Sequence, residues 1–301
     1  MARTLFARGA RGVHVQRAQQ RLQELRMPLD SADGMFGGNT ESALKQFQQM
    51  NALPVTGQID FDLWPRLTGD AEPTLEERAL QLTAAIEGHG YTLAVGNFDG
   101  AGLTWGIIGF TVMAGQVQGI LDAVATEHPG MIRATFVDLT ADLERLRKMS
   151  VAKQIDFLDG ISVPPGKHRL VDPWRIAFDR LGAMREVQEI QRRFAFQRYM
   201  EPAKQTFRKL GLTTELGLAL CFDIHVQNGS IKSSAMTAIN AAGARTEAAL
   251  RVAIANAVAD QSREKYREDV RSRKLAIATG RGVVHGMTLD LANWGLADVP
   301  A

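Results

Sequence analysis

Helical spacing of apolar residues runs through most of the 301-residue sequence, and residues 91–110 are the clearest interruption. In that stretch Thr104, Trp105 and Ile107 have β character and glycine-rich turns separate the extended runs, which predicts a small antiparallel sheet. Further helices are expected over 116–127, 139–148, 173–199, 202–210, 215–227 and 246–278, with a last extended stretch over 283–291. The chain is therefore predicted to be mainly α.

Composition excludes several classes of protein. Hydrophobic residues make up 45% of the chain, too many for a disordered protein. Lys and Arg number 35 against 33 Asp and Glu, so no general basic field attracts nucleic acid, and we expect no nucleic-acid partner. No run approaches the ~18 continuous apolar residues of a membrane span, and we expect no membrane insertion.

Cysteine and histidine give no sign of a metal centre or a disulfide. Cys221 is the only cysteine, so no intramolecular disulfide can form, and its apolar neighbours predict a buried thiol. The six histidines include no His-x-x-x-His pair, and we expect neither a metal nor a cofactor. His89 is read either as an exposed helix-end residue or as part of a cleft wall.

Residues 13–69 predict three short amphipathic helices with turns between them. The apolar residues expected to face inward are Val15, Leu22, Phe47 and Trp64. The segment that follows, Gly-Asp-Ala-Glu-Pro, has the composition of a linker. We therefore predict one domain over residues 1–69 and a second over 70–301.

Two carboxylates flank one potential cleft where a helix joins the predicted sheet. Thr74 and Glu77 form a capping box at the start of a helix with an apolar stripe, and Glu87 lies on its last turn. Carbonyl groups at a helix carboxyl terminus disfavour an ionised side chain, which suits Glu87 to donate a proton. Asp99 lies in an Asp-Gly turn whose backbone donors favour its charged form, and Thr104 follows on the next strand. From spacing alone, an ordinary helix-end glutamate and an ordinary turn aspartate explain the pattern as well.

The segment from Asp99 to Phe110 (DGAGLTWGIIGF), with Glu87 before it, resembles the catalytic signature of the family 46 glycoside hydrolases, the chitosanases of the lysozyme superfamily. Further matches in the same order are Pro202-Ala203, the run from Gly217 to Gly229, and Arg273-Lys274. The resemblance implies a lysozyme-like α+β fold of two helical lobes with the small sheet at a cleft. It also implies these roles: Glu87 as general acid, Asp99 as general base, Thr104 as holder of the water, and Arg273 with Asp223 in a buried charge network.

The sequence also departs from that family. Its usual arginine and tyrosine after the catalytic aspartate are replaced by Ala101 and Leu103, and the spacing between acid and base is shorter. Residues 70–301 hold 27 basic and 27 acidic side chains, whereas chitosan, a polycation, favours an acidic cleft. The mixed charges of residues 263–274 predict a solvated helix face. The resemblance implies that Arg273 is the exception and points inward.

The N-terminal residues closely resemble the three-helix peptidoglycan-binding module. The matching positions include Gly12, Val15, Leu22, Asp33-Gly34, Phe36-Gly37, Phe47-Gln48, Thr56-Gly57, Asp60 and Trp64. Together the two resemblances predict a monomeric wall hydrolase that cleaves β-1,4 bonds between amino sugars of peptidoglycan glycan strands by an inverting mechanism. A chitosanase and a non-catalytic wall-binding protein are the alternatives.

The first twelve residues are basic but lack the apolar core of a secretory signal. We therefore expect synthesis in the cytoplasm and action at the bacterial cell wall after phage lysis or specialised export.

Overall fold

The computed structural model describes residues 3–301, which form two compact units. The first unit runs to Ile86 and resumes over Tyr199–Ala301, and the second is Glu87–Arg198. Both are mainly helical, and their sheets are small and antiparallel, which confirms the predicted fold class. No helix within residues 3–301 has the length and apolar character that a membrane span requires.

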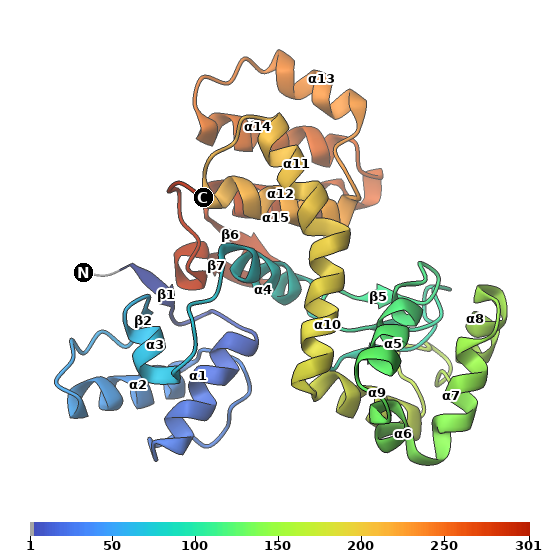
Figure 1. Ribbon diagram of the computed structural model, residues 1–301. Helices are drawn as coiled ribbons and strands as arrows, with labels where there is room; N and C mark the ends of the chain where they lie inside the picture. Colours follow the sequence, from blue (N-terminus) through green and yellow to red (C-terminus); the bar gives the residue numbers. More distant parts are fainter. Residues whose placement is uncertain (1–2) are drawn as a thin grey trace. The chain divides into compact units, whose positions relative to one another are not determined.

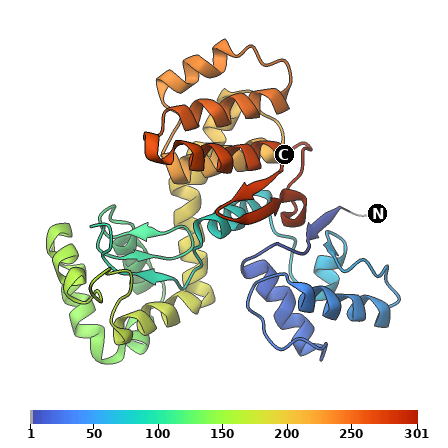
Figure 2. The same ribbon diagram turned by 180° about the vertical axis from the view of Figure 1, so that it is seen from behind.

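A three-helix bundle forms the N-terminal part of the first unit (Figures 1 and 2). Its helices are α1 (Val13–Glu24), α2 (Gly38–Met50) and α3 (Leu63–Thr68), and strand β1 (Thr4–Phe6) pairs with β2 (Ile59–Asp60). All four residues expected to face inward are buried. The apolar spacing of residues 13–69 thus predicted the three helices correctly.

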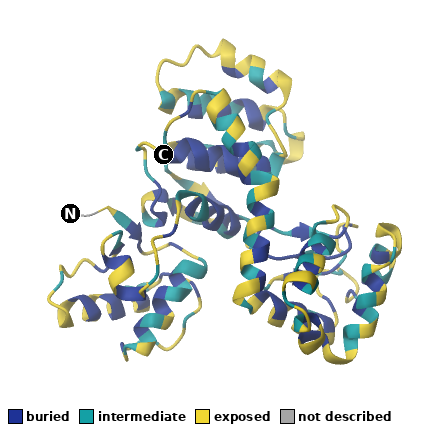
Figure 3. Cartoon of the chain, viewed as in Figure 1, coloured by how far each residue is buried: buried dark blue, intermediate teal, exposed yellow. Residues whose placement is uncertain are grey.

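Helices α11 (Glu201–Lys209), α14 (Glu247–Asp260) and α15 (Arg267–Thr279) of the first unit pack on α12 (Glu215–Asn228), and α13 (Ser233–Ala241) packs on α14. Every residue of α12 from Glu215 to His225 is buried, and the helix is dark blue in Figure 3 along most of its length. The remaining elements are α4 (Leu75–Glu87) and a hairpin of β6 (Arg281–Val284) with β7 (Met287–Asp290).

The prediction of one helix over residues 246–278 is wrong. Two helices, α14 and α15, lie side by side instead, because the polar residues 261–266 interrupt the apolar stripe and form a turn at the surface. Cys221 on α12 is fully buried, as expected, and burial raises the pKa of its thiol to about 12.

The bundle is joined to the other helices of the first unit by several direct contacts. Beyond the end of β1, the Ala7 N–H donates to the carbonyl of Asn293, at 3.1 Å. At the start of α1, the N–H of Val13 donates to Gln81 Oε1 of α4, at 3.1 Å. A Cβ atom at Gly12 would lie 2.0 Å from the same oxygen, so α1 begins against α4.

The segment with linker composition is also held in place. Arg17 Nε donates to Asp70 Oδ2 at 2.7 Å, and the indole of Trp64 donates to the carbonyl of Ala71 at 2.8 Å. Arg78 of α4 donates to the carbonyl of Pro73 at 2.8 Å. These bonds fix the segment at both ends, so it is not a free tether.

The second unit contains the predicted sheet, with strand order β3 (Ala94–Val95), β4 (Thr104–Trp105) and β5 (Phe110–Thr111). Its helices are α5 (Gln116–Glu127), α6 (Met131–Phe136), α7 (Thr140–Arg147), α8 (Val151–Gly160), α9 (Asp172–Ala183) and α10 (Arg185–Ala195). Trp105 of β4 packs on Phe178 of α9, with ring centroids 5.3 Å apart. This aromatic core continues through Phe136 and Trp174.

The prediction of one helix over residues 173–199 is also wrong. Met184 has extended backbone angles, so α9 and α10 are separate helices. Just before the break, a Cβ atom at Gly182 would lie 2.2 Å from the carbonyl oxygen of Tyr91. The glycine therefore permits close backbone approach between α9 and the segment that leads into the sheet.

Candidate active site

Glu87 is the last residue of α4, where sequence analysis placed it. The helix starts at the predicted capping box: Thr74 Oγ1 accepts from the N–H of Glu77, and Glu77 Oε2 accepts from the N–H of Thr74. It ends where Gly88 adopts a left-handed conformation with φ of 70°. The Glu87 side chain is half-buried.

Asp99 lies in an exposed turn between β3 and β4. The N–H of Ala101 donates to Asp99 Oδ1 at 3.0 Å, which is the kind of backbone donor expected for an Asp-Gly turn. The next hydrogen bond within the turn joins the N–H of Gly102 to Asn97 Oδ1, at 2.8 Å. The turn thus holds the Asp99 carboxylate at the surface with one oxygen bonded to the backbone.

A second loop, residues 162–168, fixes the turn that carries Asp99. The N–H of Asn97 donates to Ser162 Oγ at 2.9 Å, and the N–H of Gly96 donates to the carbonyl of His168 at 3.2 Å. Asp159 Oδ1, at the end of α8, accepts from Asn97 Nδ2 and from Lys167 Nζ, both at 2.7 Å. The position of Asp99 is therefore set by contacts that sequence analysis did not identify.

Thr104 and His89 lie close together at the sheet. Thr104 is half-buried on β4 and pairs with Val95 and Thr111. A Cβ atom at Gly109 would lie 3.2 Å from both Thr104 Cγ2 and His89 Nε2, so the absence of a side chain there lets the imidazole approach the strand.

The environment of His89 differs from that of an exposed helix-end residue. Burial lowers the pKa of its imidazole, and the negative charge of Glu87 acts in the opposite direction. The buried Nδ1 atom has no hydrogen-bond partner among residues 3–301. Of the two readings of His89, the half-buried position beside Thr104 contradicts an exposed helix-end residue, and a place in a cleft wall stays a prediction.

Asp223 and Arg273, predicted as a charge network, do form one in the first unit. The Arg273 guanidinium donates to both Asp223 oxygens, with Nη2 at 2.6 Å from Oδ1 and Nε at 3.0 Å from Oδ2. Lys274 Nζ lies 2.5 Å from Asp223 Oδ2. Burial by itself would raise the pKa of Asp223, but the charges and hydrogen bonds of the two cations hold it well below its usual range.

Lys274 corrects one expectation and Thr83 adds a residue that sequence analysis missed. Lys274 is 0% exposed, so the face on which it lies is not a solvated one. Thr83 Oγ1 donates to Asp223 Oδ1 at 3.2 Å. Because Thr83 and Glu87 are four residues apart, they lie on one face of α4. This spacing could have identified Thr83 from the sequence.

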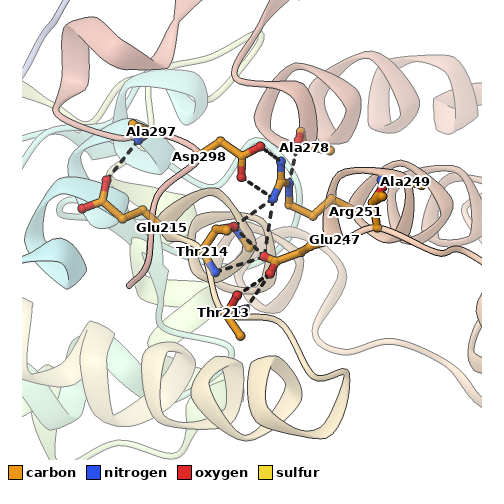
Figure 4. Close-up of polar contacts among 11 residues, drawn as sticks. Thr213, Thr214, Glu215, Glu247, Ala249, Arg251, Ala278, Ala297 and Asp298 are labelled. Carbon is orange, nitrogen blue, oxygen red and sulfur yellow. Dashed lines mark hydrogen bonds and ion pairs between the residues drawn. The ribbon is translucent and has the colours of Figure 1, made fainter.

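A second network joins α12, α14 and the C-terminal segment (Figure 4). Arg251 is 2% exposed and donates to both oxygens of Asp298, each at 2.8 Å. Glu247 accepts from the backbone and hydroxyl groups of Thr213 and Thr214. Burial alone would raise the pKa of Glu247, whereas these hydrogen bonds lower it below its usual value. Because these contacts join α12, α14 and the C-terminal segment to one another, we assign the network a structural role.

Residues 3–301 contain no cluster of three His, Cys, Asp or Glu side chains that could hold a metal ion.

Comparison with known families defines the class of protein. Residues 84–258, more than half of the chain, match the family model described as glycosyl hydrolase family 46, so the protein is a glycoside hydrolase. It belongs to glycosyl hydrolase family 46. Residues 11–67 match the model described as a putative peptidoglycan binding domain. Both resemblances and the predicted enzyme class are therefore confirmed.

Three solved structures are similar to the chain. The native chitosanase of Bacillus subtilis MY002 has 20% identity over 68% of this chain and 86% of that chain, with a TM-score of 0.48. A mutant of the chitosanase from the same organism, complexed with 6 GlcN, has 19% identity, the same coverage and a TM-score of 0.48. The Gynuella sunshinyii family 46 chitosanase with chitotetraose has 15% identity over 69% and 86%, with a TM-score of 0.47. No curated protein sequence matches the chain.

Proposed function

We propose that the protein is a cell-wall hydrolase that cleaves β-1,4 bonds between the amino sugars of peptidoglycan. The observation that carries this proposal is the peptidoglycan-binding domain that precedes the family 46 domain in one chain. Attachment to an insoluble polymer raises the local concentration of the enzyme at its bonds without any new contact in the active site. We place the boundary between the two functional domains at residues 69 and 70.

The proposed mechanism uses Glu87, Asp99 and Thr104. Glu87 protonates the leaving oxygen, and Asp99 deprotonates a water on the opposite face of the sugar while the Thr104 hydroxyl holds that water. For an inverting pair of this kind, the two carboxyl groups stand about 6.5 to 9.5 Å apart in the substrate complex. The hydrogen bond from the N–H of Ala101 to Asp99 Oδ1 supports this role, since it holds the carboxylate in one orientation on the turn.

Asp223 and Arg273 are proposed to position the acid rather than to touch substrate. Thr83, which donates to Asp223, lies one helical turn before Glu87 on α4. A fully buried ion cluster at this point restricts the last turns of the helix. Its loss is expected to lower kcat through disorder of Glu87.

Chitosan hydrolysis is the second candidate, favoured by membership in family 46. The similar structures from Bacillus subtilis and Gynuella sunshinyii are chitosanases. Against it stand the equal numbers of acidic and basic residues over 70–301 and the peptidoglycan-binding domain.

Digestion of purified sacculi and of chitosan, followed by mass spectrometry of the fragments, tests both candidates. The wild type is expected to release muropeptides with new reducing ends, whereas Glu87→Gln and Asp99→Asn release at least about 100-fold less and still sediment with sacculi. Release of fragments from chitosan and not from sacculi would show that the substrate is chitosan rather than peptidoglycan. Sedimentation with no reducing ends from either polymer would leave a non-catalytic wall-binding protein.

We further propose that the protein is bacteriolytic and reaches the wall as an endolysin does, after phage lysis, or through specialised export. Cells exposed to the protein from outside should lyse once the wall is accessible, and Glu87→Gln should not lyse them. Lysis by that variant equal to wild type would overturn the proposal.

A further inference from the structure

The phenylalanine next to Asp99 is exposed, although every other phenylalanine of the chain is buried or half-buried. Phe98 is 46% exposed. Its ring stacks on the exposed imidazole of His168, with centroids 4.5 Å apart and planes inclined by 21°. A phenylalanine usually contributes to a protein by being buried in its core. Phe98 does not have this role, because much of its ring stays in water.

The two stacked rings come from separate loops that are closely joined. Gly96 and Asn97 of the first loop bond to His168 and Ser162 of the second, as described above. A Cβ atom at Gly96 would lie 2.5 Å from the carbonyl oxygen of Lys167, so the backbones meet where no side chain fits. The stacked pair is therefore fixed before any ligand arrives, which reduces the entropy lost on binding.

The pair also lies beside Asp99, because Phe98 directly precedes it in the chain and both residues are exposed. Neighbouring Cα atoms are about 3.8 Å apart, so Phe98 is within one sugar ring of the Asp99 backbone. A pyranose ring has polar hydroxyl edges and an apolar face of C–H groups. An aromatic face in water matches that apolar face, while fixed polar groups nearby orient the ring.

We infer that Phe98 and His168 form a stacking platform that binds one amino-sugar ring of the substrate beside Asp99. This inference rests on the proposed function in one respect, namely that Asp99 faces the scissile bond. The platform contributes affinity that is equal in the ground state and the transition state, since it touches a ring and no reacting atom. Its removal should therefore raise KM and leave kcat unchanged.

A set of variants of the full chain separates this role from a structural one. Phe98→Ala should raise KM on soluble glycan fragments about 10-fold with kcat within twofold, an effect of about 1.4 kcal/mol. Phe98→Tyr keeps the ring and should restore wild-type KM. Met113→Ala is the matched control, because Met113 is 56% exposed and its N–H donates to the carbonyl of Ala101 on the same turn.

A binding measurement tests the platform without activity. In the Glu87→Gln chain, the Cε1–H NMR signal of His168 is assigned by its loss in His168→Gln and followed during titration with tetra-N-acetylglucosamine. The signal should shift, and adding Phe98→Ala should move the titration midpoint about 10-fold higher. A shift with tetraglucosamine and none with tetra-N-acetylglucosamine would support the platform and favour chitosan as the substrate.

The outcomes distinguish the two proposals. A His168 signal that does not respond to either oligosaccharide, or a KM of Phe98→Ala equal to that of Met113→Ala, would overturn the platform while the Glu87→Gln result still supports hydrolysis. A response of His168 together with a wild type that degrades neither polymer would support a sugar platform and overturn the proposed hydrolase.

Discussion

Asp223→Asn removes the carboxylate that Arg273 and Lys274 share, and it does so without changing the volume of the side chain. All three groups are 0% or 1% exposed, so water cannot replace the lost charge. Breaking a buried ion pair by removing one partner costs about 3 to 5 kcal/mol. The population in which α12 opens should therefore rise by a factor of about 140 to 3,700.

Cys221 provides the assay, since it lies two residues from Asp223 on α12 and is fully buried. Its thiol should resist alkylation at pH 8 in the folded protein, and its labelling rate reports how often α12 opens. The control is Asp260→Asn. Asp260 forms a 2.6 Å ion pair with Arg271 of α15, but its side chain is 58% exposed, so we expect at most about 1 kcal/mol.

The pH dependence supplies a second check on the same prediction. Because the folded-state pKa of Asp223 is lowered, its contribution is fully present above the ordinary value near 3.8 and is lost as pH falls below it. The difference between wild type and Asp223→Asn should be constant from pH 5 to 8 and shrink at lower pH. Equal labelling rates for Asp223→Asn and Asp260→Asn would refute the reasoning.

Three further perturbations have definite expected results. Glu215→Gln should lower stability to urea by about 3 kcal/mol, because the buried guanidinium of Arg78 lies 2.7 Å from Glu215 and loses its ion pair. Gly182→Ala should lower the melting temperature of the second unit by several degrees, since the new Cβ would collide with the carbonyl of Tyr91. Calorimetry measures this change, and an unchanged melting temperature would mean that the two backbone segments can move apart at no cost. Burial lowers the pKa of His225, so stability should fall as pH drops below about 6.5, and His225→Asn should flatten this part of the profile in denaturant titrations.

Local patterns predicted the elements well where the residues that determine a helix or strand lie within that element. The capping box of Thr74 and Glu77 marked the start of α4, and the change to β character marked the sheet that contains Thr104. Helix ends were harder, because they depend on neighbours. The break at Met184 follows the close approach of Gly182 to the backbone of Tyr91, about 90 residues away in sequence.

The site was only partly accessible to the same reasoning. Resemblance to a family supplied Asp223 and Arg273, whereas the mixed charges of residues 263–274 gave no sign that Lys274 is buried, although most of that run is exposed or half-buried as predicted. The contacts of Asn97 with Asp159 and Ser162 could not be read from spacing, since they join a turn to the end of α8 and the loop after it, about 60 residues away in sequence. Their polar residues look like ordinary loop residues until the loops meet. The roles of Glu87, Asp99 and Thr104 stay predictions for the experiments above.

The contacts between the N-terminal bundle and its neighbours limit how the protein can be divided. A shortened chain that starts at residue 70 would lose the bond from Ala7 to Asn293 and the bond from Val13 to Gln81. It would also uncover apolar surface against which Leu5 is now completely buried. The N-terminal bundle is thus packed against the rest of the first unit, and an unrelated domain put in its place would have to cover the same surface at Gln81 and Asn293.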